Sequence, residues 1–408
     1  MSAARAVTPA LPLAPDETVL LGSLAGPVRA WSEPDGALRF RDGARIRWRV
    51  HGERGWQRPE REPSRRRRTL GGTPVVEDAL RVAGGDVRVT AYGTTTGLAL
   101  EVRNASPAPV AVAFVVTGPA AGPVAEIPLP VGRDLVLLPG RRPAHVTDGD
   151  PSADSRVGDR SPDRGPDRSP DRTLGVVFPL SHRSRLRVAV CPVGAPLRDG
   201  VEPTGPEEAA RGWSTLLGVT GMRVELDDPD VMAHLDRDRA ALLLDPDPDA
   251  ATVAALEQWG FDDAARAGWA RLGLRDRLTL GRGRITGMPR SGSDPTPAGR
   301  LLDWGHRLLA DTGSRRAPEL AILPGWVADP GRAVTVHDAP TRAGRLSFAL
   351  RWHGADPLLF WEVTGPTGPV RITAPTLAPG WSTDRPSGEV LISRPGRVGG
   401  SQARRAGA

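Results

Sequence analysis

The chain has 408 residues, a length that predicts two or three domains. Hydrophobic residues make up 39%, and the 48 Gly and 42 Pro are fewer than a wholly disordered chain would carry, so folded domains joined by irregular segments are expected. All 54 basic residues are arginine, which excludes a lysine Schiff base, a Ser-x-x-Lys nucleophile and a phosphate-loop lysine.

The formal net charge is +6, and the excess of basic residues lies in residues 51–73 and 394–408. Both segments are expected to be disordered, as are residues 1–16 and 148–172, because they offer few apolar side chains to bury. A nucleic-acid site needs its basic groups on a folded face. The four-arginine run at residues 65–68 is therefore interpreted as a solvated loop, and no specific nucleic-acid partner is expected.

Short runs of alternating apolar residues dominate residues 17–193. A period of two places such residues on one face of a strand, as for Ile46, Trp48 and Val50. Seven strands are predicted, over residues 45–50, 87–91, 98–102, 109–117, 135–138, 174–178 and 186–190. With turn residues between them, these strands predict a β-sandwich over residues 17–193.

Cys191, the single cysteine, lies in one of these strand patterns and is interpreted as a buried, inert thiol. One cysteine forms no internal disulfide, and the seven histidines show no helical i, i+4 pair, so neither a metal nor a cofactor is expected. Prolines interrupt the N-terminal region and no long apolar run follows. The sequence therefore predicts no signal peptide, no membrane partner and a cytoplasmic location.

The pattern becomes helical over residues 206–318. Asp228, Asp249, Asp262 and Thr296 can each cap a helix N-terminus, and proline follows two of them at the first helical position. Four short helices are therefore expected to begin at these residues.

Residues 326–393 carry the clearest strand signal, with Leu346, Phe348, Leu350 and Trp352 at every second position. Further strands are predicted over residues 358–364, 370–373 and 389–393. Gly and Pro turns separate them, which indicates a small antiparallel sandwich. The expected fold class is mainly β with a helical insert: an N-terminal β-sandwich, a short α-helical region and a C-terminal small β-sandwich.

Several sequence segments resemble those of uncharacterised actinobacterial proteins related to six-hairpin glycosidases. In these enzymes an (α/α)6 barrel is flanked by β-sandwich domains. The resemblance is carried by residues 84–86, 100–107, 211–213, 255–262, 344–354, 359–362 and 379–382. None of these is a catalytic motif. The resemblance implies ancestry near carbohydrate-active enzymes and a carbohydrate ligand. A full barrel has twelve helices and four are predicted, so the barrel is expected to be truncated.

Glycoside hydrolysis usually requires two carboxylates across a cleft. Glu362, Glu257 and Asp303 are the candidates on predicted strands or helices. Glu257 and Asp303 are interpreted first as solvated helix acids. Glu362 lies in a strand that is apolar on both faces, so its expected structural role is a half-buried carboxylate paired with Arg351 or Arg371.

Tryptophan is unusually frequent, with eleven Trp against one Tyr and six Phe. An indole ring can stack on a sugar face or fill a core. Trp381, in a Pro-Gly-Trp-Ser turn, is the preferred carbohydrate-binding candidate, followed by Trp361 and Trp352. Trp352 is interpreted first as a core residue.

Three functions remain open from the sequence. The first is a carbohydrate-associated, non-catalytic protein with a shortened glycosidase-like region. The second is an active glycoside hydrolase with a cleft between the helices and the C-terminal sandwich, which requires two carboxylates about 5–10 Å apart. The third is a structural or protein-binding scaffold. Neither the glycan nor the oligomeric state follows from the sequence.

Overall fold

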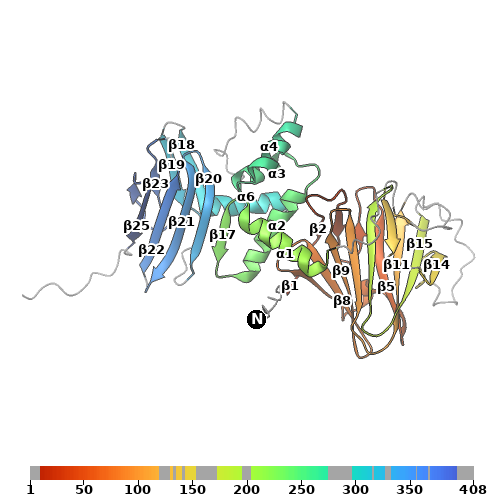
Figure 1. Ribbon diagram of the computed structural model, residues 1–408. Helices are drawn as coiled ribbons and strands as arrows, with labels where there is room; N and C mark the ends of the chain where they lie inside the picture. Colours follow the sequence, from red (N-terminus) through yellow and green to blue (C-terminus); the bar gives the residue numbers. More distant parts are fainter. Residues whose placement is uncertain are drawn as a thin grey trace, which may run out of the picture. The chain divides into compact units, whose positions relative to one another are not determined.

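The computed structural model describes residues 10–118, 129–131, 135–139, 143–152, 172–194, 204–273, 296–314, 317–326, 332–354, 356–365 and 368–392. The chain divides into two compact units (Figure 1). Unit 1 comprises residues 1–216 and 243–246, and unit 2 comprises residues 217–242 and 247–408. Four sheets and five helices occur in the described residues, which confirms the prediction of a mainly β fold with a helical insert.

Unit 1 is a sandwich of two sheets. Sheet A is antiparallel, in the order β1-β7-β8-β9-β10-β16-β13-β12. Its strands are β1 (Ala10–Pro12), β7 (Arg66–Leu70), β8 (Val75–Val82), β9 (Gly85–Gly93), β10 (Leu98–Asn104), β16 (Arg185–Pro192), β13 (Leu135–Pro139) and β12 (Leu129–Pro130).

Sheet B faces sheet A within unit 1 (Figure 1), in the order β14-β15-β11-β5-β4-β3-β2, with β6 paired to β5. Its strands are β14 (His145–Asp148), β15 (Arg172–Leu180), β11 (Val110–Gly118), β5 (Arg45–Gly52), β4 (Leu38–Arg39), β3 (Ala30–Ser32), β2 (Val19–Leu21) and β6 (Gly55–Gln57).

The core of unit 1 lies between the two sheets. Ile46, Trp48 and Val50 of β5 are all buried in it, as the period of two predicts. Phe114 of β11 packs edge-on against Phe178 of β15, with ring centroids 6.3 Å apart. All seven predicted strands are confirmed, because each carries an alternating apolar face whose burial stabilises the sheet by roughly 1.5–3 kcal/mol per large side chain.

The prediction of a disordered loop over residues 51–73 was wrong. This segment contains β6, a 3-10 turn η1 (Pro59–Arg61) and β7. Two of its arginines pair with acids outside the segment: Arg65 binds Asp78 at 2.9 Å, and Arg68 binds Glu77 at 2.6 Å. The partner acids lie on β8, outside the segment. Counting charges within residues 51–73 alone therefore makes these arginines look unpaired.

The predicted disordered termini and repeat lie largely outside the described residues. Within residues 1–16, however, β1 is ordered and pairs with β7, contrary to the prediction. Within residues 148–172, the first residues continue from β14 and the last begins β15, and residues 153–171 are not described.

Five helices are described: α1 (Pro206–Val219), α2 (Pro229–Leu244), α3 (Ala250–Gln258), α4 (Asp262–Arg271) and α6 (Pro297–Leu308). The four predicted helices are confirmed, and α1 is an additional one. Asp249 caps α3 by accepting the Thr252 N–H at 2.8 Å, and Thr296 caps α6. Asp262 does not cap α4 but is its first residue.

Two smaller sheets complete unit 2 (Figure 1). Sheet C has the order β17-β20-β21-β22-β25, and sheet D has the order β18-β19-β23-β24. Their strands are β17 (Arg223–Leu226), β20 (Val334–Thr341), β21 (Gly344–His353), β22 (Asp356–Thr364), β25 (Ser387–Leu391), β18 (Leu309–Ser314), β19 (Ala317–Ile322), β23 (Arg371–Thr373) and β24 (Ser382–Thr383). The predicted C-terminal strands are therefore present, although β23 pairs in parallel with β19.

The spacing of apolar residues predicts a purely helical range over residues 206–318, and the structure differs from this prediction. It contains β17, which pairs with β20 at the edge of sheet C, and β18, which belongs to sheet D. Strand β17 is four residues long with one buried side chain, Val224, so it shows too little alternation to be recognised in sequence.

Candidate functional site

Unit 2 contains a cleft of about 120 Å³ between the start of α2, helix α6 and the segment that follows β19. Since one water needs roughly 10–15 Å³ by this measure, the cleft has room for several waters or a small polar ligand. Its aromatic and charged lining residues are Trp304, Trp326, Asp227, Asp228 and Arg332. We call this the tryptophan cleft.

Helix α6 places Trp304 in the cleft wall. Leu301 and Leu308, on the same helix face, are buried, and Trp304 is half-buried at the edge of that face. The helix is fixed by α3, because the fully buried Trp259 donates its indole N–H to the Leu301 carbonyl at 2.9 Å. Trp304 is therefore carried by a rigid element rather than by a loop.

Trp326 packs against Trp304 and extends the aromatic wall. Its ring centroid lies 6.2 Å from that of Trp304, and the two planes are tilted by 53°. The buried Nε1–H of Trp326 has no hydrogen-bond partner among the described residues. A buried donor left unpaired costs about 1–3 kcal/mol. A ligand atom that accepts this N–H would remove the cost.

The two cleft carboxylates each hold backbone. Asp228 caps α2 by accepting the N–H groups of Asp230 and Val231, both at 3.1 Å, through Oδ1. Asp227 accepts the N–H of Ala333 at 3.2 Å through Oδ2. These contacts use one oxygen of each side chain, so the carboxylates can present their other lone pairs to donor groups such as hydroxyls.

Trp352, one of the predicted carbohydrate-binding residues, lies behind the cleft. It is half-buried, and its indole N–H donates to the carbonyl of Arg332 at 2.9 Å. It therefore positions a lining residue and does not itself line the cleft.

Trp361 and Trp381, the other two predicted tryptophans, form a separate pair. Trp361 is buried and donates to the Arg385 carbonyl at 3.0 Å. Trp381 is half-buried and meets Trp361 edge-on, with ring centroids 5.3 Å apart. Trp361 therefore fills core, and Trp381 retains a partly exposed ring.

The structure contradicts the role expected for Glu362. This residue is exposed on β22, opposite Ser347 and Ser387, and is not half-buried. Arg351 lies over the ring of Phe360, at 5.9 Å, and Arg371 donates to Ser382. The alternate face of β22 is open to solvent, so an acid there needs no buried partner.

The other predicted acids are on helices. Asp303 is exposed and forms an i, i+4 ion pair with Arg307 at 2.7 Å. Glu257 is half-buried on α3. Neither these two nor Glu362 is among the described lining residues of the tryptophan cleft.

The sequence does not reveal the cleft, although it places one of its residues, Asp228, at a helix cap. Trp326 and Asp227 carry no local signal, since they lie about 100 positions apart in sequence. The pairing of β17 with β20 brings Asp227 beside Ala333, and the segment after β19 contributes Trp326.

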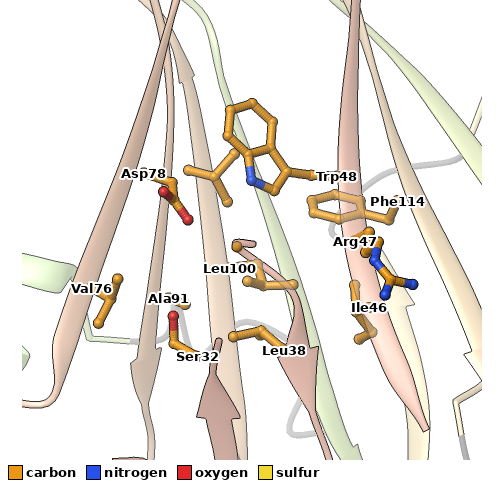
Figure 2. Close-up of a pocket in the computed structure, with 12 residues that line it drawn as sticks. Ser32, Leu38, Ile46, Arg47, Trp48, Val76, Asp78, Ala91, Leu100 and Phe114 are labelled. Atoms are coloured by element: carbon orange, nitrogen blue, oxygen red, sulfur yellow. The ribbon is translucent and has the colours of Figure 1, made fainter. Parts of the chain in front are cut away.

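A second cavity lies inside the sandwich of unit 1 (Figure 2). Its volume is about 20 Å³, which suits one water molecule. Its polar lining residues include Asp78, which binds Arg65, and Trp48, whose Nε1 has no hydrogen-bond partner among the described residues. Leu100 and Phe114 supply apolar walls, as Figure 2 shows. This cavity is too small for a ligand and belongs to the core.

In the described ranges, no group of three or more His, Cys, Asp or Glu side chains is arranged to hold a metal ion. Within the same ranges, none of the helices combines the length and apolar character needed to cross a bilayer.

Comparisons with known proteins give little for this chain. No family model and no curated protein matches the sequence. One solved structure that matches part of the chain is a family GH92 alpha-mannosidase from Bacteroides thetaiotaomicron, at 12% identity and a TM-score of 0.19. The match covers 45% of this chain and 27% of the mannosidase chain, so this protein spans about a quarter of that structure. A similarity of this extent does not define a shared fold.

Proposed function

We propose that this protein binds a neutral carbohydrate, without hydrolysing it, in the tryptophan cleft. The observation that carries the proposal is an aromatic wall of two packed indoles, Trp304 and Trp326, with carboxylates in the same cleft. Indole faces pack against the apolar C–H faces of a sugar ring, and carboxylates accept hydrogen bonds from its hydroxyls. The cleft offers both kinds of contact within one small volume.

The positions of the two cleft carboxylates do not suit hydrolysis. A glycosidase needs one carboxylic acid with a raised pKa and a second carboxylate across the substrate. Asp227 and Asp228 are consecutive in sequence, and each holds backbone N–H groups with one oxygen. They line one side of the cleft as neighbours, which suits hydroxyl binding better than attack from opposite faces.

The test compares two tryptophans of unit 2 against a panel of neutral oligosaccharides. Trp326→Ala should weaken binding at least tenfold, while Trp381→Ala, at the separate Trp361 pair, should leave it within twofold. Isothermal titration calorimetry measures both. Loss of binding only in Trp381→Ala would move the site to the position favoured by the sequence, and no binding across the panel would overturn the proposal.

Aryl glycosides test the absence of hydrolysis. The wild-type protein should release no aryl group above the rate of buffer. Asp227→Asn and Asp228→Asn serve as matched variants, because asparagine retains the acceptor oxygen that each backbone contact uses. Turnover by the wild type that disappears in either variant would make this protein a hydrolase instead.

A further inference from the structure

The outer face of sheet A carries two cross-strand rows of polar side chains. These rows lie on strands β7, β8, β9, β10 and β16, on the side opposite the sandwich core. From the strand register, the first row is Arg68, Glu77, Thr90, Glu101 and Arg187, and the second is Arg66, Ala79, Arg88, Arg103 and Arg185. The second row thus places arginine on four of five neighbouring strands.

Helix α1 covers only one end of this face. Ala210 of α1 packs with Tyr92 and Ala99 in a small apolar cluster, and Glu207 lies close enough to Tyr92 to affect its titration. Tyr92 and Ala99 lie two positions along their strands from the first polar row, and the arginine row lies two positions further. The arginine row is therefore at the end of the face that α1 leaves open.

Seven arginines on this face share three carboxylates, which leaves a net charge of +4. Glu77 pairs with Arg68, and Asp86 and Glu101 each pair with three arginines. The N–O distance between Arg68 and Glu77 is 2.6 Å. Asp86 lies 2.7 Å from Arg66, 3.5 Å from Arg81 and 3.7 Å from Arg88. Glu101 lies 2.7 Å from Arg187, 3.9 Å from Arg103 and 4.0 Å from Arg185.

The acids lie beneath the arginines. The Glu101 side chain is 4% exposed and that of Asp86 is 11%, whereas Arg66, Arg81 and Arg185 are 58–62% exposed. A group approaching from solvent meets guanidinium N–H donors first. The shared acids hold those guanidiniums in place without neutralising them, so the face is prepared for an anion rather than merely solvated.

The shape of the row indicates an extended ligand. Neighbouring strands are about 4.8 Å apart, so the row from β7 to β16 spans roughly 19 Å across the sheet. It lies on a sheet face, and none of its residues lines either of the cavities described above. A single small anion would engage one or two guanidiniums, whereas a chain with repeated anionic groups can engage the whole row.

The same face is poorly suited to nucleic acid. Single-strand binding uses aromatic side chains on which bases stack. The two rows contain no aromatic residue, and the nearest one, Tyr92, is fully buried. Base edges in the major groove of a duplex are read by a helix or a two-stranded ribbon, and the arginine row presents neither.

We propose that the arginine row on the outer face of sheet A binds an acidic polysaccharide, a chain with repeated carboxylate or sulfate groups that runs across the strands. This site goes beyond the proposed function: it lies in the other unit and takes an anionic rather than a neutral glycan. Guanidinium binds both carboxylate and sulfate through paired N–H donors, and the contacts at this exposed face are screened by salt.

The experiment measures binding of the full chain to four probes by biolayer interferometry: dextran sulfate for sulfate, polygalacturonate for carboxylate, neutral dextran, and DNA in single- and double-stranded forms. Dextran sulfate or polygalacturonate should bind, with affinity that falls steeply between 50 and 300 mM salt. Binding to only one of the two identifies the anion. Dextran should not bind.

The decisive variant is Arg103→Gln/Arg185→Gln, since both arginines are the more distant partners of Glu101 and Arg187 still pairs with it at 2.7 Å. Its dissociation constant for the acidic polysaccharide should rise at least tenfold. The control Arg54→Gln/Arg266→Gln removes the same charge from two exposed positions elsewhere and should change binding less than twofold.

If circular dichroism shows that the glutamine variant is unfolded, Arg103→Lys/Arg185→Lys replaces it. The lysine variant retains the charge but loses the paired N–H donors, so its binding should be about threefold weaker or more. The proposal is overturned if both double variants of arginine to glutamine weaken binding equally, if DNA binds as tightly as the polysaccharides, or if no polyanion binds. Trp326→Ala should leave polyanion binding unchanged, which separates this result from the test of the tryptophan cleft.

Discussion

Trp259, the residue directly after α3, donates its indole N–H to the carbonyl of Leu301 in α6, at 2.9 Å, from a position that is fully buried. This contact fixes the helix that carries Trp304. Gly305 lies on the same interface, and a Cβ there would meet the side chain of Gln258 at 2.3 Å, so the two helices are closely packed. The geometry of the tryptophan cleft therefore depends on a residue outside it.

Replacing Trp259 by phenylalanine should destabilise unit 2 by about 2 kcal/mol, because the variant loses a buried hydrogen bond and part of a large side chain. Ligand binding in the cleft should weaken as well, since α6 loses its anchor. Urea unfolding measures the first effect and calorimetry the second. A variant with unchanged stability would show that the Trp259–Leu301 contact does not hold the helix pair.

Gly93, at the end of β9, should not tolerate a side chain. A Cβ there would lie 1.9 Å from the backbone carbon of Gly22, which belongs to another segment of unit 1 and has no flexible end to move. Gly93→Ala is expected to cost at least 3 kcal/mol. Gly52→Ala is the matched control: a Cβ meets nothing within 4 Å, so stability should be unchanged or slightly increased. Thermal unfolding of both variants checks the contrast.

Asn104 organises the turn after β10 through both ends of its amide. Its Nδ2 donates to the carbonyls of Ala108, Leu180 and Ser181, and its Oδ1 accepts from the N–H and hydroxyl of Ser106. Asn104→Asp should destabilise unit 1 by about 3 kcal/mol at neutral pH, since an ionised carboxylate would face three carbonyl oxygens. Part of this loss should be recovered as the pH falls toward 4, because the buried carboxyl is then protonated and can donate. Equal unfolding midpoints for variant and wild type at pH 7 would contradict this role.

Asp78 should make stability depend on pH. Burial raises the pKa of its carboxyl in the folded protein, although Arg65 and Arg67 act in the opposite direction. Between the ordinary value of 3.8 and the raised folded pKa, the folded state binds more protons than the unfolded state. The stability contribution of Asp78 is therefore fully present below pH 3.8 and lost as the pH rises through the folded pKa.

The corresponding measurement compares wild type with Asp78→Asn, a neutral side chain of the same shape. The unfolding free energy of the variant should gain on that of the wild type as the pH rises from 3.5 to 7. A difference that is constant with pH, or that moves toward the wild type, would mean that the ion pair with Arg65 outweighs the cost of burial.

Strands with strict alternation were accessible to prediction, and short or charged ones were not. Ile46, Trp48 and Val50 define their strand without any knowledge of its neighbours, because the burial of one face is a local property of the sequence. Strand β7 begins with three consecutive arginines and reads as solvated until the acids of β8 and β9 are placed beside it. The stability of β7 comes from ion pairs and backbone hydrogen bonds to strands distant in sequence, which a short stretch of sequence does not reveal.

The same distinction applies to the candidate site. The sequence favours Trp381 and Glu362, which lie in distinctive C-terminal segments. In the structure, Trp381 packs against Trp361 and Glu362 is exposed to solvent. Trp326 and Asp227 lie in unremarkable segments about 100 residues apart and meet at the cleft. Sequence reasoning ranks residues by their neighbours in the chain, while a binding site is made of neighbours in space.

The pairing of β17 with β20 has a practical consequence for anyone who divides the chain. A fragment that starts at residue 326, where the sequence suggests a natural boundary, would lose β17 and would leave the backbone N–H and C=O groups of residues 334–337 in β20 without their partners. An exposed strand edge is a template for self-association. Unit 2 should therefore remain monodisperse when expression begins upstream of β17, and should self-associate when the first hundred residues of the unit are omitted.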